Sequence, residues 1–137
     1  MSRFKTGLLQ KADNARGNAV IEFALTLPIL LLVVFGITEL GRMVMTTNVL
    51  NTASREGARL AAVSSITDSL TVYARVAEVL NAAEIDSSTT TVVYNVAARS
   101  VTVRVTTNFQ ILSRSVLPPV LRGTIPLSGE TVFRYEG

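Results

Sequence analysis

The sequence predicts an α+β fold in which a long N-terminal helix and a second helix pack against a small antiparallel sheet. Three observations support this prediction. An apolar run occupies residues 19–37, apolar residues recur every three or four positions after residue 69, and stretches rich in threonine and valine alternate from residue 89. A period near 3.6 indicates a helix and a period of two indicates a strand. With 137 residues, the chain has room for one small domain beyond the apolar run.

Residues 1–17 form a short basic leader. Four basic residues oppose one acid there, whereas nine arginines and nine acids balance after Gly17, so the whole net charge of +3 belongs to the leader. Basic residues that flank an apolar segment keep that end of the chain in the cytoplasm. The basic character therefore predicts topology and gives no support for nucleic-acid binding.

Residues 18–38 are predicted to form a transmembrane helix. Only Glu22 and Thr26 are polar between residues 19 and 37, and 19 helical residues span about 28 Å, close to the hydrocarbon thickness of a bilayer. A secretory signal peptide is disfavoured because its apolar region is shorter and ends at small residues. Pro28 either bends this helix or lets it re-pack when it leaves the bilayer.

Glu22 lies just inside the apolar segment, where a carboxylate is costly without a partner. One interpretation is that its side chain extends toward the lipid headgroups. The other is that the chain is cut after Gly17, because the new α-amine of Asn18 would supply a cation. The spacing of Gly17 and Glu22 favours the second interpretation.

Residues 39–137 are predicted to form one extracytoplasmic α+β domain. The first helix continues over 39–63, and a second helix covers 69–83 after a cap at Thr67 or Asp68. Its expected buried face comprises Leu70, Tyr73, Val76, Ala77 and Leu80. The sheet region, 89–137, contains strands at 89–96 and 100–109, joined by a loop of about four residues, and a last strand at 125–135. Residues 111–121 are expected to be irregular or briefly helical before two prolines.

Small residues recur along the first helix. Gly36 and Gly41 permit the close approach of another backbone. Ala53, Gly57 and Ala61 lie four residues apart and serve either close packing on the domain's own sheet or packing between subunits. For this C-terminal half of the helix, we favour packing on the chain's own sheet.

The chain contains neither cysteine nor histidine. The commonest general base, the commonest metal ligand and every thiolate are therefore missing. No phosphate loop, metal cluster or catalytic triad can be assembled from this sequence. We expect a protein that is not an enzyme and has no catalytic residue, metal or cofactor.

Three separated motifs stand out in this sequence: RGNAVIEFAL at 16–25 with Pro28, GITELGR at 36–42 and ASREGAR at 53–59. In this order and at this spacing they resemble the TadE-like family, the minor pilins or pseudopilins of bacterial tight-adherence (Tad or Flp) type IVb pili. The resemblance covers about residues 16–62, and the mature chain would begin with Asn18 where many pilins have Phe or Met.

The resemblance implies a pilin-like architecture in which residues 1–17 are a prepilin leader. A prepilin peptidase would cut between Gly17 and Asn18, and Glu22 would pair with the N-terminal amine of an adjacent subunit. The implied partners are the major Flp pilin, a TadF-like minor pilin and the inner-membrane Tad assembly platform. The implied location is the bacterial inner membrane, with the extracellular pilus as a second location.

The implied role is the initiation, priming or capping of a pilus used for surface adherence. The alternative is a single-pass membrane-anchored binding module with no filament role. The Gly17 and Glu22 pair discriminates between the two, because a simple anchor needs neither residue.

Overall fold

The structure, a computed structural model, describes residues 3–64, 69–111 and 123–135, with side chains from Gly17 onward. Helix α1 runs over Arg3–Val63 and helix α2 over Ser69–Ala82. The strands are β1 (Ser88–Asn95), β2 (Ser100–Gln110) and β3 (Thr124–Arg134). The α+β class is confirmed, with helix ends and strand ends within one residue of most of the expected boundaries. The expected cap at residues 67–68 and nearly all of the 111–121 excursion lie outside the described residues.

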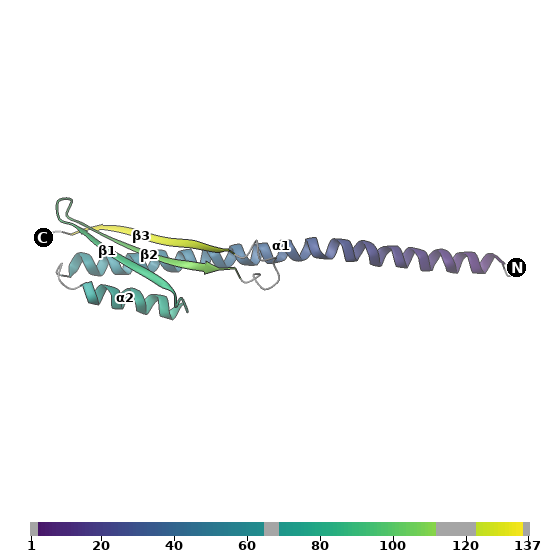
Figure 1. Ribbon diagram of the computed structural model, residues 1–137, viewed down its shortest axis with the longest axis horizontal. Coiled ribbons are helices and arrows are strands. Elements are labelled where there is room, and N and C mark those ends of the chain that lie inside the picture. Colours follow the sequence, from purple (N-terminus) through teal and green to yellow (C-terminus); the bar gives the residue numbers. More distant parts are fainter. Residues whose placement is uncertain (1–2, 65–68, 112–122, 136–137) are drawn as a thin grey trace. The chain divides into compact units, whose positions relative to one another are not determined.

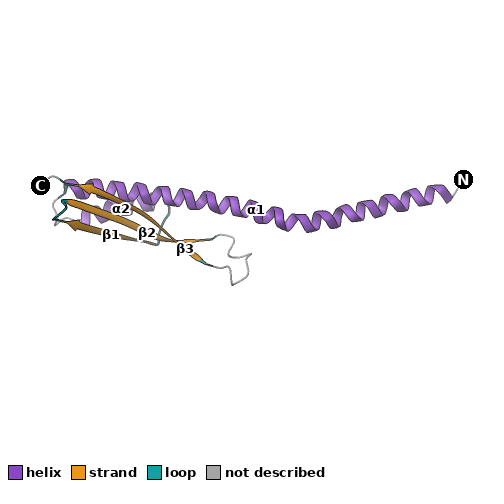
Figure 2. Ribbon diagram, turned by 90° about the horizontal axis from the view of Figure 1, so that it is seen from above, coloured by secondary structure: helices purple, strands orange, loops and turns teal. Residues whose placement is uncertain are grey.

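The chain divides into two units, Met1–Thr38 and Glu39–Gly137. The first contains the N-terminal part of α1. The second contains the rest of α1, together with α2 and the sheet, which lie beside one another in Figures 1 and 2. In this second unit the two helices form one layer and the sheet forms the other, as expected when each element has a single apolar face to bury.

The sheet has the order β1-β2-β3 and both pairs of strands are antiparallel. Asn95 pairs with Ser100, so the β1–β2 connection is the expected loop of four residues. The Asn95 side chain closes this loop by accepting a hydrogen bond from the Ala98 N–H at 3.0 Å. Arg99 adopts a left-handed backbone with φ of 46°. A four-residue loop closed by an asparagine side chain therefore stands where a tight two-residue turn would need glycine.

The core of the second unit lies between the sheet and the two helices. Its buried apolar residues come from α1 (Leu50, Ala53, Ala58, Ala61), α2 (Val72, Val76, Leu80) and the central strand (Val101, Val103, Val105). The alternating valines of β2 face the helices, as the period of two predicted, whereas Arg104 on the opposite face is exposed.

The expected buried face of α2 is partly wrong. Val76 and Leu80 are buried, but the third buried position is Val72, while Leu70 is 81% exposed and Tyr73 is 39% exposed. Two adjacent stripes of this helix are apolar, so the three-four spacing alone cannot choose between them. Val72 and Val76 both lie against Gly57 of α1, since a Cβ there would be 3.6 Å from a methyl carbon of Val72 and 2.6 Å from one of Val76.

Candidate functional site

Residues 19–37 present apolar side chains on every face of α1. Phe23, Leu25, Ile29 and Leu32 are each more than half exposed, and no part of the most apolar stretch is buried. Among the described residues, this is the one helix long and apolar enough to cross a membrane. Leaving so much apolar surface in water is unfavourable, which makes the segment compatible with a single-pass membrane anchor.

Glu22 is exposed on this apolar helix, five residues after Gly17. Its carboxylate has no ion pair among the residues whose side chains are described. The Thr26 hydroxyl donates to the Glu22 carbonyl at 3.0 Å or to the Phe23 carbonyl at 3.1 Å. The Ala24 carbonyl loses its helical donor because Pro28 has no N–H. Gly17 is exposed and helical, and a Cβ built on it would meet nothing within 4 Å.

The small residues of α1 fall into two groups. Gly36 and Gly41 face open space, since a Cβ added to either would meet nothing within 4 Å. By contrast, Ala53, Gly57 and Ala61 are buried, and a Cβ on Gly57 would lie 2.6 Å from a Val76 methyl carbon and 3.3 Å from one of Val103. In the C-terminal half of α1, therefore, these small residues let the helix approach the chain's own sheet and α2.

Gly129 and a buried hydrogen bond join β3 to α1, and the sequence analysis did not single them out. A Cβ on Gly129 would lie 2.5 Å from the Leu50 carbonyl carbon, so only glycine permits this approach of strand and helix backbones. The hydroxyls of Ser54 and Thr131 are 2.8 Å apart, and Ser54 also donates to the Asn51 carbonyl. An isolated glycine inside an alternating strand was the available signal for such a contact.

Several charged side chains of the second unit form ion pairs with one another. Arg42 lies 2.9 Å from the Glu39 carboxylate and stacks over the Phe109 ring at 5.0 Å. Glu56 lies 3.6 Å from both Arg59 and Arg75. The hydrogen bond that Arg75 donates to the Glu78 carboxylate, with the attraction of that charge, raises the pKa of Arg75. The pairs that involve Arg59 and Arg75 are exposed enough to contribute little to stability.

The side chains that bind metal ions do not converge in the described part of the chain. No group of three or more histidine, cysteine, aspartate or glutamate residues lies close enough there to hold a metal ion. The features that remain distinctive are the exposed apolar segment at residues 19–37 of α1, the one carboxylate within it, Glu22, and the preceding Gly17.

Comparison with known proteins gives one match. Residues 17–59 match the family model described as TadE-like protein. No curated protein and no solved structure matches the chain significantly. The matched residues contain the apolar segment, Glu22 and four of the small residues of α1, namely Gly36, Gly41, Ala53 and Gly57.

Proposed function

From the premise that residues 17–59 are TadE-like and thereby tie this chain to the Tad pilus machinery, we propose that it is a minor pilin, or pseudopilin. A prepilin peptidase cuts it between Gly17 and Asn18. The mature chain then takes part in the initiation, priming or capping of a Tad pilus used for adherence. Its partners are the major Flp pilin, a TadF-like minor pilin and the inner-membrane assembly platform. It has no catalytic role.

The observation that carries this proposal is one carboxylate, Glu22, exposed on an apolar helix and five residues beyond Gly17. An ion left alone in a low dielectric is strongly unfavourable, whereas an amine and a carboxylate at short range attract far more strongly there than in water. Cleavage after Gly17 creates such an amine on Asn18. The amine of one subunit and Glu22 of its neighbour can therefore fix the register between them.

The charge distribution supports the topology. The leader carries the whole net charge of +3, which keeps the N-terminus in the cytoplasm and directs residues 39–137 across the membrane. Removal of the leader leaves a chain with no net charge. The same cut thus ends the function of the topology signal and produces the amine that Glu22 needs.

A single-pass membrane-anchored module that binds a ligand outside the cell is the alternative. It accounts for the apolar helix and the folded outer domain. It does not account for a carboxylate inside that helix with no ion pair among the described side chains, which a simple anchor would lose at no cost.

The decisive variant is Glu22→Gln, which keeps the side-chain volume and removes the charge. We expect normal cleavage and membrane insertion, with recovery in sheared pili reduced by about tenfold or more, because one buried ion pair is broken. Glu78→Gln is the matched control, because that carboxylate is exposed on α2. Incorporation of Glu22→Gln at the level of the control would refute the proposed role of the acid.

Processing is tested separately with Gly17→Leu. A bulky side chain at this position should block the peptidase, so the variant should accumulate at the full length of the precursor. A band of mature size on a gel would contradict the predicted cleavage site.

A further inference from the structure

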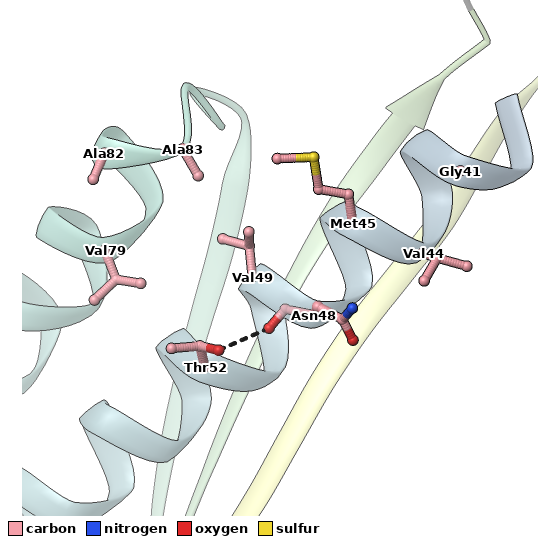
Figure 3. Close-up of a pocket in the computed structure, with 9 residues that line it drawn as sticks. All are labelled: Gly41, Val44, Met45, Asn48, Val49, Thr52, Val79, Ala82 and Ala83. Atoms are coloured by element: carbon pink, nitrogen blue, oxygen red, sulfur yellow. Dashed lines mark hydrogen bonds between the residues drawn. The ribbon is translucent and has the colours of Figure 1, made fainter. Parts of the chain in front are cut away.

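Within the second unit, the side of α1 that its own fold leaves uncovered changes in character along the helix. Figure 3 shows part of this stretch, from Gly41 to Thr52. In chain order, the exposed residues are apolar (Leu40, Val44, Met45), then polar and uncharged (Asn48, Thr52), and then cationic (Arg55, Arg59). At about 3.6 residues per turn, all of these positions fall on one side of the helix, which we call the outward side.

The two charged residues of this unit that precede Arg55 are turned toward the sheet instead. Glu39 and Arg42 form an ion pair at 2.9 Å, and the guanidinium carbon of Arg42 lies 5.0 Å from the centre of the Phe109 ring. The Glu39 side chain is only 14% exposed. The outward side therefore carries no charged residue over positions 40–54, although charged residues occur in the same part of the sequence.

The apolar part of the outward side adjoins the predicted membrane span, 18–38. Leu40 follows that span by two residues, and α1 is helical without a break over Arg3–Val63. Leu40, Val44 and Met45 are 61–69% exposed, and leaving such a cluster in water is unfavourable. Because the chain enters this stretch directly from the span, the bilayer is the apolar phase closest to these residues along the helix.

We propose that the outward side of residues 40–45 contacts lipid, so that the second unit rests against the extracytoplasmic leaflet on this side. The inference rests on the membrane span of the proposed function and adds a contact beyond it. At about 1.5 Å per residue, Leu40 and Met45 lie roughly 3 and 10 Å beyond residue 38, whereas the headgroup region is roughly 5–8 Å thick on each side of the bilayer. A tilt of about 20°, which is typical of membrane helices, lets Met45 reach that region on the outward side.

This contact gives the second unit a definite orientation on the membrane. The two helices form one layer of the unit and the sheet forms the other, so lipid on the outward side of α1 meets the helix layer. The exposed face of the sheet then remains in water, where Arg104 and Glu130 keep their solvent-exposed ion pair. Asn48 and Thr52 mark the level at which the outward side leaves the lipid.

The test measures lipid contact at single positions of the full-length chain, with one copy in each lipid nanodisc. Each variant carries one cysteine bearing a fluorophore, and the lipids carry a spin-label quencher on the headgroup. The chain contains no native cysteine, so the label is specific. Leu40→Cys and Met45→Cys should be quenched at least about threefold more strongly than Leu70→Cys, a label at an 81% exposed apolar residue of α2. Ile37→Cys, at the end of the span, is the positive control.

Gln110→Cys distinguishes a contact on one side from an upright unit. Gln110 is exposed and follows Phe109, which packs against Arg42, so it lies near the level of Arg42 on the sheet side. That level is closer to the span along α1 than Met45 is. An upright unit would therefore quench Gln110→Cys at least as strongly as Met45→Cys, whereas the proposed contact quenches Met45→Cys more strongly.

Each outcome decides the inference. Quenching of Met45→Cys no stronger than that of Gln110→Cys or Leu70→Cys overturns it, and if Ile37→Cys is still quenched, the span and the proposed function stand without it. Absence of quenching at Ile37→Cys as well removes the span, and both proposals fail. Protection of Met45→Cys from both the lipid quencher and iodide in the water would mean that protein covers the outward side, which also overturns the lipid contact.

Discussion

Residues 19–37 and residues 50–61 belong to the same helix, but the apolar side chains of the first stretch are exposed and those of the second are buried. In the first stretch, large side chains such as Leu25 and Ile29 are 65–70% exposed. In the second, Leu50 and Ala53 are completely buried by the sheet and α2. The difference lies in residue size, since the second stretch places small residues where other elements must approach closely.

This difference in burial predicts which property a substitution in each stretch should change. The C-terminal stretch is complete once its own chain has folded, so its substitutions should alter the stability of the second unit. The N-terminal stretch has no cover from its own chain in the described structure, so its substitutions should alter membrane insertion or assembly instead. The four predictions below test that division through unfolding of the second unit in the detergent-solubilised full chain. Its three tyrosines all follow residue 72 and there is no tryptophan, so tyrosine fluorescence reports this domain alone.

The largest effect is expected from Leu50→Ala. Leu50 is fully buried at the centre of the contact between α1 and the sheet, so its removal leaves a cavity. The free energy of unfolding should fall by about 3–5 kcal/mol in a urea titration. Leu30→Ala, in the apolar stretch, should leave it unchanged; an equal loss at both positions would contradict the division.

Gly129→Ala should produce the next largest loss. The added methyl group would lie 2.5–2.6 Å from backbone atoms of Leu50 and Asn51, which cannot move aside as a side chain can. We expect a loss of about 2–3 kcal/mol in the same titration. Gly41→Ala, where the methyl group meets nothing, should instead gain up to about 1 kcal/mol from helix propensity. Similar results for the two variants would show that β3 does not approach α1 closely.

Ser54→Ala tests the contribution of one hydrogen bond between α1 and β3. The Ser54 hydroxyl is buried and lies 2.8 Å from that of Thr131, which would lose its partner. We expect a loss of about 1–2 kcal/mol, measured by thermal unfolding. Thr52→Ala removes an exposed hydroxyl that bonds only within its helix, and should cost less than about 0.5 kcal/mol.

The smallest effect is expected on the outer face of the sheet. Arg104 donates two hydrogen bonds to one oxygen of Glu130, at 2.6 and 2.9 Å, but both side chains are substantially exposed. Arg104→Ala should therefore cost less than about 1 kcal/mol, and that cost should shrink as salt is added. A salt-independent loss above 2 kcal/mol would mean that this face is covered.

Much of the fold follows from local patterns in the sequence. The valines of β2 alternate clearly enough to predict both the strand and its buried face. The apolar run from residue 19 is recognisable from its own composition and length alone. The buried face of α2 was not predictable, because Leu70 and Val72 offer equivalent apolar stripes and only the packing of α2 against α1 and the sheet distinguishes them. The contact of Gly129 with Leu50 joins residues far apart in sequence, so only the folded chain reveals it.

The two residues proposed to act in processing and assembly could also be identified from the sequence, but for a different reason. Gly17 and Glu22 stand out because they contradict their surroundings: a small residue at the end of a basic leader, and a charge inside an apolar segment.

The most direct test of the account is the N-terminal sequence of this protein recovered from sheared pili. The account predicts a chain that begins at Asn18, present in that fraction only when the prepilin peptidase is active. A chain that still begins at Met1, or one found only in the inner membrane whether or not the peptidase is present, would contradict it.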